Sequence, residues 1–202
     1  MTLHMHLSYR RLAVGAALAT LLQLAGITTS AQTGCEPEDF AAWAVNTGPS
    51  AGFLSAAVDI HVARWSTERD KGRFARTQLN RGPEALLKAL RLADSVGTIR
   101  TPMTFPDDII FAWQEPDMDG ARRTILVTDR PMVVWRESIH VAGSEDLFTV
   151  VELRIDATGE GEGKVAIGSN IAVDRSLDLI QLEDYTAEPV RFIDVHSKRR
   201  TE

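Results

Sequence analysis

Two pairs of acidic and histidine residues, each two positions apart, are the first candidates for chemistry in this sequence. Asp59 and His61 fall within one expected strand, as do Asp194 and His196. Residues two apart on a strand share a face, and a carboxylate beside an imidazole can form half of an acid–base or metal site. Such pairs are more commonly ordinary polar groups on a strand surface. Because the histidines are far apart and have no nearby His or Cys, we predict neither a metal nor another cofactor.

Nucleophilic catalysis has no clear signal in the chain. The Gly-x-Ser-x-Gly elbow is absent, and Cys35 has no basic neighbour in the sequence that would activate its thiol. A catalytic set of serine, histidine and an acidic residue can be proposed, for example with Ser138 and His140, but the spacing of these residues does not support it. The catalytic residues are therefore left unassigned, and a small exported hydrolase using His61 or His140 stays an alternative.

Aromatic residues are the best candidates for ligand binding in this sequence. Trp65, Trp113 and Trp135 lie on or at the ends of expected strands, where they could line one rim of a sheet and stack on a sugar or another flat ligand. Arg154 and Glu152 lie on the polar face of a long expected strand and could add a polar binding surface. Half-buried packing and a solvated ion pair are the alternatives for these five residues.

The glycine-rich string from Gly159 to Lys164 superficially resembles a phosphate-binding loop. A phosphate-binding loop runs from a strand through Gly, Lys and Ser or Thr into a helix. Here Lys164 leads into the strand-like run 165–167, and the two intervening glutamates would repel a phosphate. We therefore predict a flexible hairpin turn.

Residues 1–31 have the order of a secretory signal peptide, with basic residues, an apolar run and small residues before a cut after Ala31. The apolar run is about fifteen residues long, shorter than the roughly twenty that span a bilayer. We expect a cleaved Sec-type leader, no membrane span after its cleavage, and a periplasmic or extracellular protein. Arg10 and Arg11 fit the twin-arginine signal only loosely, and lipidation of Cys35 stays an alternative.

Composition restricts the partners and the source of stability. Removing residues 1–31 from the 202 leaves 171 residues and takes away two arginines, so 20 basic residues face 28 acidic ones and the net charge is about −8. An acidic chain is a poor partner for nucleic acid or an anionic membrane. A single cysteine permits no internal disulfide, so a hydrophobic core has to stabilise the fold.

The periodicity predicts one α+β domain over residues 57–196, preceded by a connecting segment or tether over 32–56 and followed by a basic tail over 197–202. The first strand is expected over 57–65. Thr67 and Asp70 indicate a helix start, and Gly82 followed by Pro83 indicates the junction between helices at about 68–80 and 84–94. Period-two segments with short turns follow at 96–101, 108–114, 122–128, 132–136, 148–156, 164–173, 177–183 and 190–195. We expect a mainly antiparallel, curled β-sheet with two helices inserted after the first strand.

Several strings carry a resemblance to a known group of proteins: RWSTERD (64–70), GPEALLKAL (82–90), VGTIRTP (96–102), TDRPM (128–132), VELRIDATGEGEGKV (151–165) and IQLEDYTAEPVR (180–191). They resemble a family of uncharacterised exported bacterial proteins, Acidobacteria among them. The resemblance implies that the β-rich segment is one unit, and it implies no activity, ligand or site residue.

Export together with a strand-rich chain favours a soluble, exported, non-enzymatic binding module. Its partner would be a small ligand held within the curled sheet or a component of the cell envelope bound on the surface. The sequence predicts neither the identity of that partner nor the oligomeric state.

Overall fold

The structure is a computed structural model and describes residues 36–46, 54–102, 104–132, 148–167, 171–174, 179–182 and 190–199. The expected leader, Cys35, Trp135 and His140 lie outside the described residues. Among the helices in these ranges, none combines the length and apolar character needed to cross a membrane.

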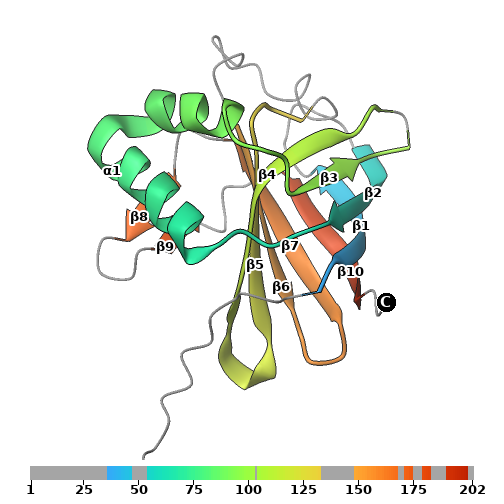
Figure 1. Cartoon of the computed structure of the whole chain (residues 1–202). Helices are drawn as coiled ribbons and strands as arrows, with labels where there is room; N and C mark the ends of the chain where they lie inside the picture. The colour runs from blue at the N-terminus through green and yellow to red at the C-terminus, as the bar shows by residue number, and fades with distance from the viewer. Residues whose placement is uncertain are drawn as a thin grey trace, which may run out of the picture. The chain divides into compact units, whose positions relative to one another are not determined.

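Eight antiparallel strands form a closed barrel (Figure 1). Their order around the barrel is β1 (Glu38–Asn46), β10 (Val190–Arg199), β7 (Glu160–Ile167), β6 (Thr149–Ile155), β5 (Arg122–Thr128), β4 (Asp107–Pro116), β3 (Gly97–Arg100) and β2 (Leu54–Val62). A separate two-stranded sheet contains β8 (Ile171–Asp174) and β9 (Leu179–Leu182). A short 3-10 helix, η1 (Met118–Gly120), lies between β4 and β5.

The antiparallel pairing is confirmed, but the expected α+β class is wrong because the sheet closes into a barrel with one helical element. Residues 38–46, which we expected in a tether, form β1 and pair with both β10 and β2. In β1 the inward residues Phe40, Ala42 and Ala44 are buried at alternate positions. The period of two is hard to recognise because Ala41 and Trp43, on the outward face, are also apolar.

Inward-facing side chains form one hydrophobic core inside the barrel. Its largest fully buried members are Phe40, Phe192, Ile60, Ile99, Ile109, Leu126, Met132 and Leu153. An eight-stranded barrel has an interior just wide enough to be filled by side chains or to hold one small ligand. In this protein, residues from all eight strands occupy the interior.

A polar network lies at one end of this interior. The Arg122 guanidinium donates to both carboxylate oxygens of Glu38, with Nη1 2.6 Å from Oε2. It also donates to Gln114 Oε1 at 2.9 Å and to Ser197 Oγ at 2.7 Å. The Glu38 and Arg122 side chains are 1% and 15% exposed. This network brings strands β1, β4, β5 and β10 together where the apolar core ends.

One helical element, α1 (Glu68–Arg91), stands where we expected two helices, and that expectation is wrong. The predicted start is confirmed, because Thr67 and Asp70 form a reciprocal capping box. Gly82 has φ 80° and ψ −177°, so the helical backbone is kinked directly before Pro83, and the predicted junction at Gly82 and Pro83 is confirmed as a kink within this element. The element also follows the second strand, because β1 precedes the strand that we expected to be first.

A second hydrophobic cluster lies between α1 and the outer wall of the barrel. Phe74, Leu86, Leu87 and Leu90 of α1 are buried against outward residues of β4, β5 and β6. Phe74 contacts Phe111 edge to face, with 5.8 Å between ring centroids. The helix therefore covers one side of the barrel wall.

Residues 160–164 of the glycine-rich string belong to β7 and only Gly159 lies in a turn, so the expectation of a flexible turn over the whole string is wrong. A Cβ at Gly161 would lie 2.1 Å from the Arg154 carbonyl oxygen, and one at Gly163 would lie 2.8 Å from that of Glu152. Both positions need glycine because β6 approaches closely there. The turn itself is earlier, at 156–159, where Asp156 accepts hydrogen bonds from the backbone of Thr158 and Glu160.

Candidate functional site

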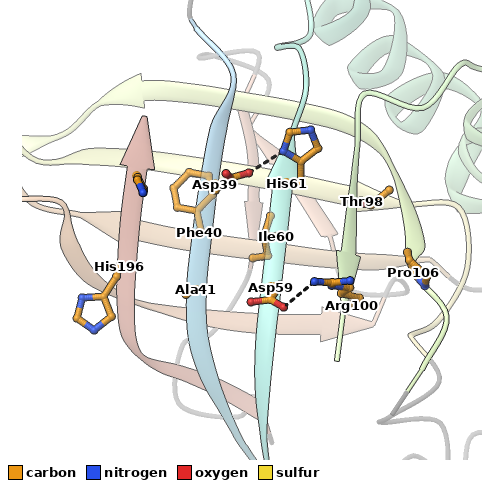
Figure 2. A pocket seen from close by; sticks show the side chains of 11 residues that line it. Asp39, Phe40, Ala41, Asp59, Ile60, His61, Thr98, Arg100, Pro106 and His196 are labelled. Atoms are coloured by element: carbon orange, nitrogen blue, oxygen red, sulfur yellow. Dashed lines mark hydrogen bonds and ion pairs between the residues drawn. The ribbon is translucent and has the colours of Figure 1, made fainter. Parts of the chain in front are cut away.

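A groove of about 620 Å³ lies along the outer wall of the barrel, over β10, β1, β2 and β3 (Figure 2). This wall differs from the wall that α1 covers, which consists of β4, β5 and β6. Charged and polar side chains from four strands line the groove, among them Asp39, Asp59, His61, Arg100, His196 and Lys198. Because the barrel strands are hydrogen-bonded on both sides, their side chains are carried on rigid backbone.

An aspartate–histidine pair lies at one end of the groove. His61 Nδ1 donates to Asp39 Oδ1 at 2.6 Å, across the β1–β2 ladder. The two side chains are 40% and 30% exposed, so solvent reaches both. Thr98 is the register partner of His61 on β3 and also lines the groove. Asp39, His61 and Thr98 therefore form a row across three neighbouring strands.

Two further ion pairs form the next row of this wall. Arg100 Nη2 lies 3.3 Å from Asp59 Oδ2, and Figure 2 shows this pair beside Ala41. His196 Nδ1 lies 2.6 Å from Glu160 Oε2 on β7. Ala41 lies between the two pairs, as the register partner of both Asp59 and His196. Because the side chain of Ala41 is only a methyl group, the floor of the groove is low between the charged side chains on either side.

The two acid–histidine pairs singled out from the sequence are not contact pairs. His61 bonds to Asp39 rather than Asp59, and His196 pairs with Glu160 rather than Asp194. Successive residues on one strand face are about 6.7 Å apart, whereas side chains directly across a ladder have Cβ atoms about 4.5–5.5 Å apart. Contact partners on a barrel wall are therefore found across the ladder.

Asp194 lies in a β-bulge of β10. The register with β1 shifts between the pairs Ala41–His196 and Trp43–Ile193, and Asp194 has φ 49°. A bulge inserts one extra residue and re-aims the neighbouring side chains. As a result, Ile193 faces outward opposite Trp43, while Val195 points into the core.

The predicted binding tryptophans do not come together on one surface. Trp65 is 7% exposed, belongs to the core inside the barrel, and donates from Nε1 to the Glu36 carbonyl oxygen at 3.0 Å. Trp113 is 5% exposed and lies in the cluster beneath α1, with Lys71 Nζ 4.6 Å from its ring centroid. Trp135 lies outside the described residues.

Glu152 and Arg154 share the outer face of β6, as expected, but their surroundings differ. Glu152 is buried and pairs with Arg123 at 3.2 Å and with Lys164 at 3.7 Å. Arg154 is half-exposed and pairs with Asp117 at 3.0 Å. Glu152 thus belongs to a buried ion network on β5, β6 and β7, away from the strands that form the groove.

The groove can exchange hydrogen bonds with a polar ligand and could move a proton. Asp39 fixes the imidazole of His61 through Nδ1, so Nε2 is the nitrogen that would accept or deliver a proton. Throughout the described ranges, no three His, Cys, Asp or Glu side chains are grouped so that they could hold a metal ion. The groove therefore offers hydrogen bonds, charge and two imidazoles, those of His61 and His196, each held through Nδ1 by a carboxylate.

Sequence reasoning missed Asp39, Arg100 and Lys198 as members of this wall. Asp39 was assigned to a tether, and Lys198 to a basic tail that proves to be the end of β10. The available signal was the polar residue at alternate positions of each strand, as in Asp59 and His61. Those positions can be assembled into one site only when the order of the strands around the barrel is known.

Comparison of the chain with protein families, curated proteins and solved structures found no match.

Proposed function

We propose that this protein is an exported binding module that holds a polar ligand in the groove over β10, β1, β2 and β3. Export rests on the expected leader, and the ligand would belong to the periplasm or the cell exterior. Two sources remain for it, a small molecule or a component of the cell envelope. Both would present hydroxyl, amide or charged groups to the same outer wall.

We place the ligand on the outer wall because side chains already fill the interior of the barrel. Phe40, Phe192 and Leu153 are fully buried within the core. A ligand inside the barrel would have to displace such side chains, and each large buried side chain contributes about 1.5–3 kcal/mol to stability. An external groove needs no such rearrangement.

The groove is also preorganised for polar contacts. Asp39, Asp59 and Glu160 are each held by a cationic or imidazole partner at 2.6–3.3 Å. Side chains already fixed by ion pairs lose less conformational entropy when a ligand binds. The same pairs remain solvent-accessible, so a ligand could exchange hydrogen bonds with them directly.

Native mass spectrometry of the protein purified from its own host tests this proposal. A ligand that copurifies with the wild type should be lost from the double variant Asp59→Asn/Arg100→Gln, which changes two groove residues that lie outside the core. The matched control is Arg154→Gln, which disrupts a comparable exposed ion pair on another wall. Retention of the ligand by the double variant, or its loss from the control alone, would refute the external site.

A hydrolase is the second candidate, and the Asp39–His61 hydrogen bond favours it. An imidazole whose Nδ1 is held by a carboxylate is oriented to act as a general base through Nε2. Arg100 and Lys198 line the same groove and could stabilise an anionic transition state. His140, the other histidine considered for this role, lies outside the described residues.

A panel of ester, phosphoester and glycoside substrates separates the two candidates. General-base catalysis predicts that His61→Ala loses most activity and that Asp39→Asn loses about a hundredfold or more. Equal turnover by wild type and His61→Ala on every substrate that is cleaved would eliminate this hydrolase mechanism.

A further inference from the structure

We propose that the groove takes a neutral carbohydrate, with one sugar ring stacked on Trp43. This inference rests on the proposed external site and adds the chemical class of its ligand. Three observations carry it: an exposed tryptophan on the groove-bearing wall, the low floor beside it, and the balance of charge along the groove.

Trp43 exposes 49% of its surface although it lies in the middle of a barrel strand. Its register partner on β10, Ile193, is 43% exposed, and its partner on β2 is Ala57. The bulge at Asp194 aims Ile193 outward at this level. An indole ring that remains accessible on a rigid strand, between a small residue and an aliphatic residue, offers a flat apolar surface to a ligand.

The same face of β1 leads from this ring into the groove. Outward residues follow in the order Trp43, Ala41, Asp39, two positions apart, and Ala41 and Asp39 line the groove. At about 3.4 Å per residue, the distance from Trp43 to Asp39 is about 14 Å. A strip of that length, apolar at one end and polar at the other, suits an oligosaccharide of at least two rings.

The charges along the groove favour a neutral ligand. Asp39 and Asp59 are balanced by Arg100 and Lys198 among the lining residues. Asp59 is already paired with Arg100, and Asp39 with His61. A strongly charged ligand would have to compete with one of these pairs, whereas sugar hydroxyl groups can donate to the carboxylates and accept from the cations without separating them.

Two other classes of ligand fit less well. A peptide that adds itself as an extra strand needs a free sheet edge, and the closed barrel offers none among its eight strands. A lipid tail needs a continuous apolar channel, whereas four charged side chains line the groove: Asp39, Asp59, Arg100 and Lys198.

Isothermal titration with defined tetrasaccharides tests the inference. The neutral probes are linear oligomers of glucose and of N-acetylglucosamine, and the acidic probe is a linear oligomer of a uronic acid. We expect a neutral probe to bind, Trp43→Ala to weaken its binding about tenfold or more, and Trp43→Phe to retain part of it. Leu92→Ala, which removes an apolar side chain 80% exposed at the end of α1, is the matched control and should bind like the wild type.

Tryptophan fluorescence supplies a second readout. Among the tryptophans in the described ranges, Trp65 and Trp113 are buried and Trp43 is exposed, so a shift of the wild-type emission that is absent from Trp43→Phe would report stacking on Trp43. Failure of every neutral probe to bind at millimolar concentration, tighter binding of the acidic probe, or unchanged binding by Trp43→Ala would each overturn the carbohydrate assignment.

Failure of this inference can be told apart from failure of the external site. If no carbohydrate binds, yet a copurified ligand still depends on Asp59 and Arg100, the groove stands and only the class of its ligand is wrong. If replacing both residues does not change how much of that ligand copurifies, the external site itself is wrong.

Discussion

Replacing Arg122 by methionine should destabilise the barrel by about 3 kcal/mol, at the low end of the range measured when one partner is removed from a buried ion pair. The carboxylate of Glu38, 1% exposed, would lose two donated hydrogen bonds, and Ser197 and Gln114 would each lose one. The low end applies because Arg122 is 15% exposed and borders a surface pocket of about 470 Å³. Against a typical total of about 5–15 kcal/mol, this loss is large.

Urea unfolding followed by far-UV circular dichroism measures this loss. The double variant Glu38→Leu/Arg122→Met removes both charges and should recover to within about 1 kcal/mol of the wild type, because an apolar pair leaves no buried charge behind. Arg154→Met, which breaks a half-exposed pair, is the control and should lose less than about 1 kcal/mol. If Arg122→Met loses as little as the control, or the double variant is worse than the single one, the ion pair does not stabilise this end of the barrel.

Four further predictions concern the helix cap, pH and the backbone. Thr67→Ala removes the N-cap of α1 and should lower the unfolding free energy by about 1 kcal/mol in urea titrations. Burial raises the pKa of Asp70, but hydrogen bonds from Thr67 and the charges of Arg73 and Arg64 together outweigh it, and the net pKa is lowered. The stability advantage of the wild type over Asp70→Asn should therefore be present at neutral pH, above the unfolded-state pKa, and disappear as the pH falls through the lower folded-state pKa; an advantage that grows in acid would contradict this sign. Gly161→Val should prevent or severely weaken folding, because its Cβ would lie 2.1 Å from a backbone oxygen of β6, and a thermal melt like that of the wild type would show that β6 can move away. At Asp194, substitution by Gly should be tolerated and substitution by Val should lower the melting temperature, because φ is positive there; equal melting temperatures would argue against the bulge.

Local periodicity predicted the strands well but not their closure. The expected strand 122–128 coincides with β5, whose apolar run from Ile125 to Val127 matches a strand buried on both faces. Closure depends on β1 pairing with β10, whose residues are about 150 positions away along the chain, for example Phe40 with Ser197. No local pattern encodes that pairing, so the sequence predicts a curled sheet but not its closure.

The candidate site was predictable only in part, for the same reason. Asp59 and His61 were correctly placed on one strand face, yet each contacts a neighbour from another strand. Trp43, half-exposed, was overlooked in favour of tryptophans that proved to be buried, because its strand was read as a tether. Burial of Trp65 and Trp113 follows from which wall α1 covers and from how the barrel closes, and both are long-range properties.

An NMR titration of isotope-labelled protein with the ligand that binds most tightly tests the external site most directly. We predict that chemical-shift changes gather on the backbone amides of Ala41, Asp59, His61 and Arg100 and on the indole of Trp43, while the methyl groups of Leu126, Val151 and Leu153 in the core remain unchanged. Large shifts of those core methyl groups, with the groove amides unaffected, would place the ligand inside the barrel and contradict the external site.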